Sequence, residues 1–140
     1  MTHPMASIRT FGHLELSDSS VLQNKLLLLL CYLAIEGPQP RRHLAQLFWL
    51  GATDPANRLS VALSRLRRTH PGCVEADEHR VWTDLVTDTS SFVALLEEGK
   101  TDQAAALYGG HFLNDFQCGE LQEELEEWIS ATRESLARRM

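Results

Sequence analysis

The sequence is poor in cysteine and has no Cys-x-x-Cys pair. Its three cysteines, Cys31, Cys73 and Cys118, lie far apart along the 140-residue chain. An odd number at such wide spacing does not suit a disulfide framework and is typical of a reducing compartment. The cysteines therefore predict an intracellular protein, and we expect a cytoplasmic location.

Long apolar runs are also missing. The longest, residues 26–35, is ten residues long, against about 20 for a helix that spans a membrane. The first residues lack the basic region and apolar stretch of a signal peptide. We expect a protein without a membrane partner.

The sequence lacks the motifs of common enzyme and metal sites. Its six histidines are scattered, and none is paired at the i, i+4 spacing of a metal-binding helix. Cys73 with His79 comes nearest to a metal pair, but a packed hairpin cysteine is the more frequent role. Residues 109–111 lack the Lys-Ser/Thr of a phosphate-binding loop, and no Gly-x-Ser-x-Gly elbow is present. We therefore expect no catalytic residue, no metal and no cofactor.

The charge is divided unevenly along the chain. In total, 13 Lys and Arg oppose 19 Asp and Glu, a net charge of −6, which argues against a general nucleic-acid coat. Residues 37–72, however, hold six arginines and one acidic residue, whereas residues 73–140 hold five basic and fifteen acidic residues. A basic block before an acidic half indicates local contact with nucleic acid.

Periodicity and turn residues predict the elements of the N-terminal part. Residues 8–16 suggest a strand, 17–20 a turn and 21–22 the start of a second strand. A buried, Leu-rich helix is expected over 23–36, a second helix over 43–50 and a third over 55–70. Gly37-Pro38 ends the first helix, and Asp54-Pro55 supplies the N-cap and first position of the third. Two helices joined by the short turn 51–53 predict a helix-turn-helix.

The C-terminal part begins with a predicted hairpin and continues as helices. Strands are expected at 73–75 and 79–83, then helices over 92–96 (capped by 88–91), 101–108 and from about 121 onward. The predicted fold class is mainly α with a small β-sheet, in which a winged helix-turn-helix precedes a helical segment. The predicted domains are 1–87 and 88–140.

The third helix has two distinct faces. At about 100° per residue, Ala62, Leu63 and Leu66 fall within roughly 60° of Leu59 and predict a buried stripe. The opposite face collects small polar residues and arginines, which suits the major groove because Ser and Asn allow close approach while Arg reaches guanine or phosphate. A solvated arginine face is the alternative for such a helix taken alone.

Residues 55–68 closely resemble the recognition helix of bacterial antibiotic-regulator-type (SARP-like) transcriptional activators. These proteins join an OmpR-type winged helix to an all-helical bacterial transcriptional activator domain. The resemblance extends through residues 47–49, through 108–113, and to further single positions along the C-terminal half. Those positions are Asp88, Phe92, Trp128, Arg133 and Leu136.

The resemblance implies DNA binding through the recognition helix, activation by contact with RNA polymerase, and a helical domain similar to tetratricopeptide packing. Ala56 and Ser60 stand where family members often have Arg, and Arg58 where the residue is usually small and polar, which alters the expected base preference. Helical domains of this family are usually longer, so 88–140 resembles a truncated or short one. The hairpin tip is acidic, so a wing would reach DNA through His79 and Arg80. The predicted DNA-binding residues are Arg41, Arg42, Asn57, Arg58, Ser60, Val61, Ser64, Arg65, Arg67, Arg68 and Arg80.

The function predicted first is a sequence-specific regulator that docks its recognition helix in the major groove of double-stranded DNA and recruits RNA polymerase. Two copies could bind in tandem or as a homodimer. The alternative is a protein–protein interaction module that uses the acidic helical half, with the winged helix as scaffold. An enzyme would require a metal or nucleotide that copurifies with the chain.

Overall fold

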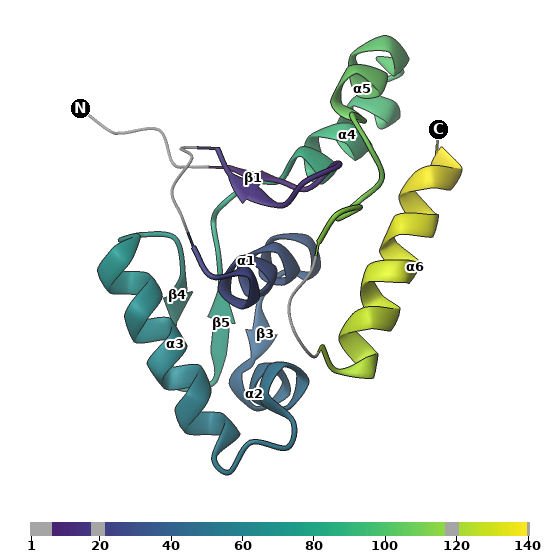
Figure 1. Cartoon of the computed structure of the whole chain (residues 1–140). Helices are drawn as coiled ribbons and strands as arrows, with labels where there is room; N and C mark the ends of the chain where they lie inside the picture. The colour runs from purple at the N-terminus through teal and green to yellow at the C-terminus, as the bar shows by residue number, and fades with distance from the viewer. Residues whose placement is uncertain (1–6, 18–21, 117–120, 140) are drawn as a thin grey trace, which may run out of the picture.

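Helices dominate the chain, and the strands are short (Figure 1). The computed structural model describes residues 7–17, 22–116 and 121–139. It confirms the expected mainly α class with small antiparallel sheets. Within the described ranges, no helix is long and apolar enough to cross a membrane. The elements are β1 (Ile8–Arg9), β2 (Glu15–Leu16), α1 (Asn24–Glu36), β3 (Gln39–Pro40), α2 (Arg41–Trp49), α3 (Pro55–Thr69), β4 (Glu75–Ala76), β5 (Arg80–Trp82), α4 (Asp88–Glu97), α5 (Thr101–Leu107) and α6 (Glu123–Arg139).

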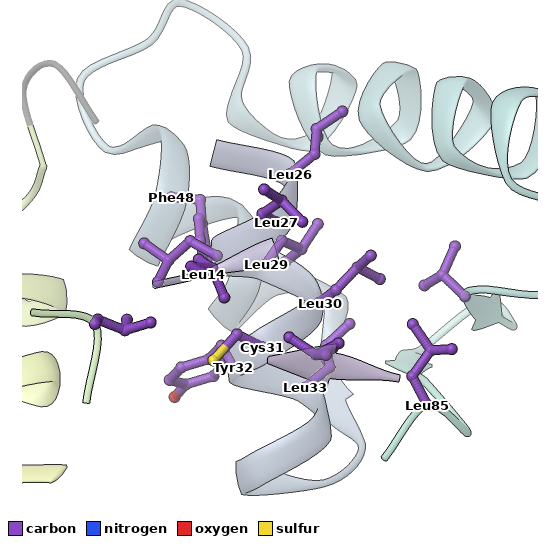
Figure 2. Close-up of a cluster of buried hydrophobic side chains, with 14 of the residues drawn as sticks. Leu14, Leu26, Leu27, Leu29, Leu30, Cys31, Tyr32, Leu33, Phe48 and Leu85 are labelled. Atoms are coloured by element: carbon purple, nitrogen blue, oxygen red, sulfur yellow. The ribbon is translucent and has the colours of Figure 1, made fainter. Parts of the chain in front are cut away.

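Helix α1 is the centre of the core. All eight residues from Leu26 to Leu33 are buried, and their side chains point to several sides of the helix (Figure 2). A helix that is apolar all round must be covered all round, and Figure 1 shows α1 between α3 and α6. It ends at Gly37, which has a φ of 83° and donates its N–H to the Leu33 carbonyl at 2.9 Å. The predicted buried helix and its glycine stop are therefore confirmed.

The strands form two small antiparallel sheets. The predicted hairpin is present as β4 and β5, and β3 joins it in the order β3-β5-β4. The sequence did not predict β3, because its two residues, Gln39 and Pro40, are defined only by their partners Val81 and Arg80.

The single strand expected over 8–16 is wrong. The segment folds back on itself as β1 and β2, with Ile8 opposite Leu16. Gly12, at a φ of 82°, lies in the turn between them. The turn expected over 17–20 and the strand start at 21–22 fall largely outside the described residues, and Leu22 is not in a strand.

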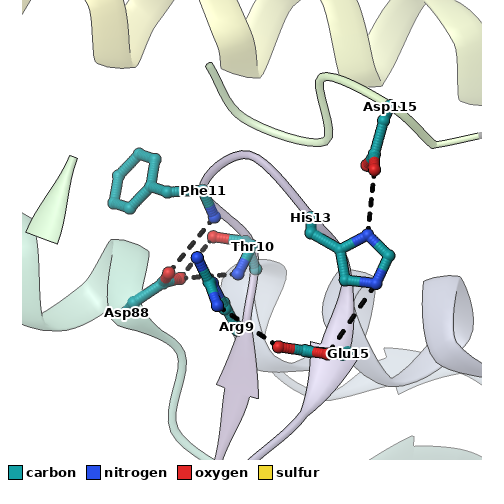
Figure 3. A network of polar contacts seen from close by, with 7 residues as sticks. All are labelled: Arg9, Thr10, Phe11, His13, Glu15, Asp88 and Asp115. Atoms are coloured by element: carbon teal, nitrogen blue, oxygen red, sulfur yellow. Dashed lines mark hydrogen bonds and ion pairs between the residues drawn. The ribbon is translucent and has the colours of Figure 1, made fainter. Parts of the chain in front are cut away.

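Asp88 joins the start of α4 to the N-terminal hairpin. Thr87, not residues 88–91, is the N-cap of α4, and its hydroxyl accepts the Ser90 N–H at 3.0 Å. The carboxylate of Asp88 is thereby left to accept the backbone N–H groups of Thr10 and Phe11, at 2.9 and 3.1 Å, and the Thr10 hydroxyl (Figure 3). Because Thr10 is buried, Asp88 supplies the acceptor that its polar groups need.

Trp128 attaches α6 to α1. Its ring packs edge-on against Tyr32 and Phe112, with centroid distances of 5.0 and 5.8 Å, and its Nε1 donates to the Glu36 carboxylate at 3.2 Å. The side chain is half-buried, so Trp128 bridges two helices at their edge. Buried residues from both sides of position 87 belong to one hydrophobic cluster. The division into domains at that position stays a prediction.

Gly110 permits a close crossing of two backbone segments. The Gly12 N–H donates to the His111 carbonyl at 2.9 Å, and Phe11 forms an antiparallel bridge with Phe112. A Cβ on Gly110 would lie 2.9 Å from the Gly12 Cα. The glycine pair at 109–110 is thus more than the expected helix end, since α5 already stops at Leu107.

Gly110→Ala is expected to lower the free energy of unfolding by about 1–3 kcal/mol, the usual cost of overpacking a tight site. Gly109→Ala is the matched control, because a Cβ there meets nothing within 4 Å. Urea denaturation followed by circular dichroism measures both variants. Equal stability of the two would contradict the role assigned to the crossing.

Asp88→Ala is expected to cost about 1–3 kcal/mol of unfolding free energy, because it leaves buried donors without an acceptor. Asp84→Ala removes the same charge from an exposed position nearby and serves as control. Thermal unfolding of both variants gives the comparison. If Asp88→Ala is no less stable than Asp84→Ala, Asp88 does not stabilise the β1–β2 hairpin.

Candidate nucleic-acid interface

Helices α2 and α3 are joined by a short connection that ends at a strong helix start. The Asp54 carboxylate accepts the Asn57 N–H at 3.1 Å, and Pro55 occupies the first helical position. This confirms the predicted start of α3 and satisfies one of the free N–H groups of its first turn. Helix α2 begins at Arg41, two residues before the expected position. The cause is strand pairing, since the Arg41 N–H donates to the His79 carbonyl at 2.8 Å.

One face of α3 is buried and the opposite face is exposed. The predicted stripe of Leu59, Ala62, Leu63 and Leu66 is buried in full, as the periodicity required. The face turned away from it is exposed, including Val61 at 51 % of its surface. The predicted residues on this outward face are Asn57, Val61, Ser64 and Arg68.

Four arginines lie on or beside the outward face and form no ion pair with any residue that the structure describes. Arg58, Arg65, Arg67 and Arg68 are all exposed. The Arg65 guanidinium donates to the Gln23 side-chain oxygen at 3.3 Å, a neutral partner. In the described parts of the chain, none of these four arginines forms an ion pair. The surface of α3 therefore holds positive charge that an external anion can neutralise.

Arg41 forms hydrogen bonds with both α3 and the β4–β5 hairpin. Its guanidinium donates to the Ser60 hydroxyl at 3.1 Å and to the Asp77 carbonyl at 3.2 Å. Arg41 and Ser60, both on the predicted list, are half-buried and hydrogen-bonded to each other, whereas Arg42 is exposed. Arg41 and Ser60 thus fix how the hairpin sits beside α3.

The hairpin tip is a tight turn organised by Asp77. Its side chain accepts the backbone N–H groups of His79 and Arg80, both at 2.8 Å. These hydrogen bonds, the one from Arg80 foremost, hold the pKa of Asp77 below its usual range. Arg80 itself is exposed, on the strand that pairs with β3. The hairpin thus presents Arg80 close to the N-terminal end of α2.

An open groove of about 680 Å³ lies between the hairpin tip and the N-terminal ends of α2 and α3. Arg41, Arg42 and His79 line it together with Asp54 and Glu78. This mixture of charges gives the groove no strong preference for an anion or a cation. We assign it no ligand.

The thiols of Cys31 and Cys73 are buried. Burial raises the pKa of Cys73 to about 11 and raises that of Cys31 as well, so both thiols stay protonated at neutral pH. Cys73 packs under α3 and faces the Leu66 carbonyl at 3.8 Å, as expected for a packed cysteine. Across the described ranges, no group of three or more His, Cys, Asp and Glu is placed to hold a metal ion.

Sequence reasoning missed Lys25 and Trp49 beside α3. The Lys25 Nζ lies 4.8 Å from the centroid of the Trp49 ring, and both residues line a small pocket with Arg58 and Arg65. The only sequence signal is a cation near the start of an otherwise apolar helix. These residues are far apart in sequence, and the packing of α1, α2 and α3 brings them together.

A scan of protein-family models, a search of curated proteins and a search of solved structures each find no match to this chain. The resemblance to antibiotic-regulator-type activators therefore stays a prediction, and the function is argued from the surface just described.

Asp54→Ala is expected to destabilise the protein by about 0.5–2 kcal/mol through loss of the α3 cap. Asp54→Ser keeps an acceptor at the N-cap, so its free energy of unfolding should remain close to that of wild type. Chemical denaturation of the two variants separates capping from the mere loss of a charge. Equal destabilisation by both would show that the cap does not stabilise α3.

Proposed function

We propose that this protein is a sequence-specific regulator of transcription that binds double-stranded DNA through α3. The observation that carries the proposal is the exposed face of α3, where small polar side chains are flanked by arginines that form no ion pair within the described residues. An α-helix fits the major groove, and such a face combines base contact with phosphate contact.

The residues of α3 divide by position. Asn57, near the N-terminal end, and Ser64 lie on the outward face and are proposed to meet base edges, together with Arg68. Arg58 and Arg65 lie on one flank of that face, Arg67 on the other, and they reach toward phosphates. Val61 offers an apolar contact for the methyl group of thymine.

The surroundings of α3 support a winged helix-turn-helix. Helices α1, α2 and α3 precede the β4–β5 hairpin, which is the order of that motif. The Arg41 tether to Ser60 and Asp77 fixes the hairpin beside α3, where Arg80 and His79 can approach the DNA backbone. Arg42, exposed on the first turn of α2, adds a phosphate contact.

The helical remainder is proposed to act in activation. Helices α4 and α5 pack against each other, and we propose that they form a tetratricopeptide-like pair. Figure 1 shows α6 on the far side of α1 from α3. We assign this part to contact with RNA polymerase in the cytoplasm. Copies would bind in tandem on direct repeats or as a homodimer.

Wild-type protein is expected to bind duplex DNA with a log K against log salt slope of about −4, from four or five phosphate contacts. Arg65→Ala/Arg68→Ala should weaken binding by about ten- to hundredfold at low salt and flatten the slope by about 1, because Arg65 contacts a phosphate and Arg68 a base. Arg138→Ala/Arg139→Ala is the matched control, because it removes the same charge from the exposed end of α6. Fluorescence anisotropy on pooled genomic fragments measures all three proteins.

Two results would overturn the proposal. One is the absence of salt-sensitive binding by wild type, and the other is equal binding by the α3 variant and the α6 control. If the protein binds no DNA but binds a partner protein through its helical half, the alternative function as a protein–protein interaction module is favoured instead.

A further inference from the structure

Arg41 lies where α2, α3 and the β4–β5 hairpin meet. Its backbone N–H donates to the His79 carbonyl at 2.8 Å, which joins the first residue of α2 to the hairpin. Its side chain donates from Nη1 to the Asp77 carbonyl at 3.2 Å and from Nη2 to the Ser60 hydroxyl at 3.1 Å. One residue therefore contacts the hairpin at two points and α3 at a third.

The two acceptors of this side chain lie on well-defined parts of the fold. Ser60 is half-buried in the second turn of α3, next to the buried stripe of that helix. Asp77 forms the turn at the hairpin tip, where its carboxylate accepts the N–H groups of His79 and Arg80, both at 2.8 Å. Its own N–H donates to the Arg80 carbonyl at 3.0 Å. A hydrogen bond from Arg41 to this turn therefore restrains the position of Arg80 as well.

Arg41 and Arg42 have different surroundings, although both are on the predicted list of DNA contacts. Arg42 is exposed, whereas Arg41 is half-buried. A guanidinium holds its N–H donors in a rigid fork, and in Arg41 both terminal nitrogens already donate to acceptors within the chain. A phosphate would compete for these same nitrogens. The geometry of Arg41 therefore suits a bridge between two parts of the protein better than a contact with DNA.

We propose that Arg41 and Ser60 are positioning residues, which make α3 and the hairpin bind DNA as one unit without contacting DNA themselves. This inference rests on the proposed function, since it concerns how two parts of one DNA surface are held relative to each other. Arg80 and the outward face of α3 can meet the same duplex only at a fixed separation. Because the bridge forms before DNA is bound, the hairpin need not be ordered at the expense of affinity.

The first test examines the full chain without DNA. Residual dipolar couplings from nuclear magnetic resonance compare the orientation of the hairpin N–H bonds with that of the α3 N–H bonds. Ser60→Ala should reduce the hairpin couplings relative to those of α3, whereas Ser60→Thr keeps a hydroxyl and should retain the wild-type values. Ser64→Ala removes a hydroxyl from the outward face of the same helix and is the matched control. Unchanged couplings in Ser60→Ala, or an equal reduction in Ser64→Ala, overturn the bridge.

The second test is a double-mutant cycle in the binding of duplex DNA, measured by fluorescence anisotropy on pooled genomic fragments. Arg80→Ala should weaken binding by the wild-type protein about tenfold at low salt and flatten its salt slope by about 1. In a Ser60→Ala protein, the same change at Arg80 should weaken binding no more than about threefold, because the hairpin no longer holds Arg80 at its phosphate. A Ser60→Thr protein should show the tenfold effect again.

The salt slope separates a bridge from a direct contact. Arg41→Ala/Arg80→Ala should flatten the slope by about 1 in total, because Arg41 displaces no counterion. Arg42→Ala/Arg80→Ala should flatten it by about 2, as expected for two independent phosphate contacts. Arg138→Ala removes a positive charge from the exposed end of α6 and should keep the wild-type slope. A slope flattened by about 2 in the Arg41 double variant shows that Arg41 binds a phosphate and overturns the proposal.

The outcomes distinguish this inference from the proposed function. A wild-type protein that binds no duplex overturns both. If the protein binds duplex through α3 but Arg80→Ala has the same effect with Ser60 and with Ala at position 60, the coupling is overturned and the proposed function stands. The same conclusion follows if Arg80→Ala has no effect in the wild-type protein, because the hairpin then lies away from the DNA.

Discussion

The burial of α1 is the constraint on which the rest of the structure depends. Eight successive residues without an exposed member need neighbours on every side, and the chain supplies them with α3 on one side and α6 on the other (Figure 1). Removal of this much apolar surface from water is the main favourable term for a chain of this size. The position of α3 is therefore set by the core beneath it. The proposed DNA surface is the outer side of a helix whose inner side covers α1.

A small set of directional contacts joins the N-terminal residues 10–12 to Asp88 and Gly110, and joins the segment after Gly110 to α6. Asp88 supplies acceptors for Thr10 and Phe11, and the Gly110 backbone passes directly beside Gly12. Arg133, on α6, donates to the carbonyls at 112 and 113, the second of which belongs to a residue with a φ of 49°. Asp88, Arg133 and the Gly-Gly pair belong to the pattern on which the family resemblance was based. In this structure their contacts are those of packing and positioning.

Local sequence patterns were sufficient for the parts of the fold that depend on local physics. The period of Leu59, Ala62, Leu63 and Leu66 predicted both faces of α3, and Asp54-Pro55 predicted its first residue. Each of these signals is contained within one helix and its cap. The outward face of α3, and hence the core of the candidate site, was predictable for the same reason.

The parts that could not be predicted depend on residues far apart in sequence. Strand β3 exists because β5 pairs with it, and the turn at Gly12 is fixed by the 110–113 segment. The sequence suggested Asp88 as part of the cap of α4, but the adjacent Thr87 is the N-cap. Only the fold shows that Asp88 faces the β1–β2 hairpin instead. Lys25 lies more than 30 residues from Arg58 in the chain, and no periodicity connects them. Such contacts depend on how distant segments pack together, and the local pattern of a single sequence does not show this.

The separation of charge across α1 has a consequence for how the molecule approaches a polyanion. Helix α3 carries four arginines and no acidic residue, whereas α6, on the opposite side of α1, carries five glutamates and three arginines. The protein therefore carries an electric dipole directed through its core. Near a uniform line of negative charge, this dipole produces a torque that turns α3 inward and α6 outward before any contact forms. A net charge of −6 would slow an approach in random orientation. The dipole makes the oriented approach the favoured one, and its strength falls as ionic strength rises.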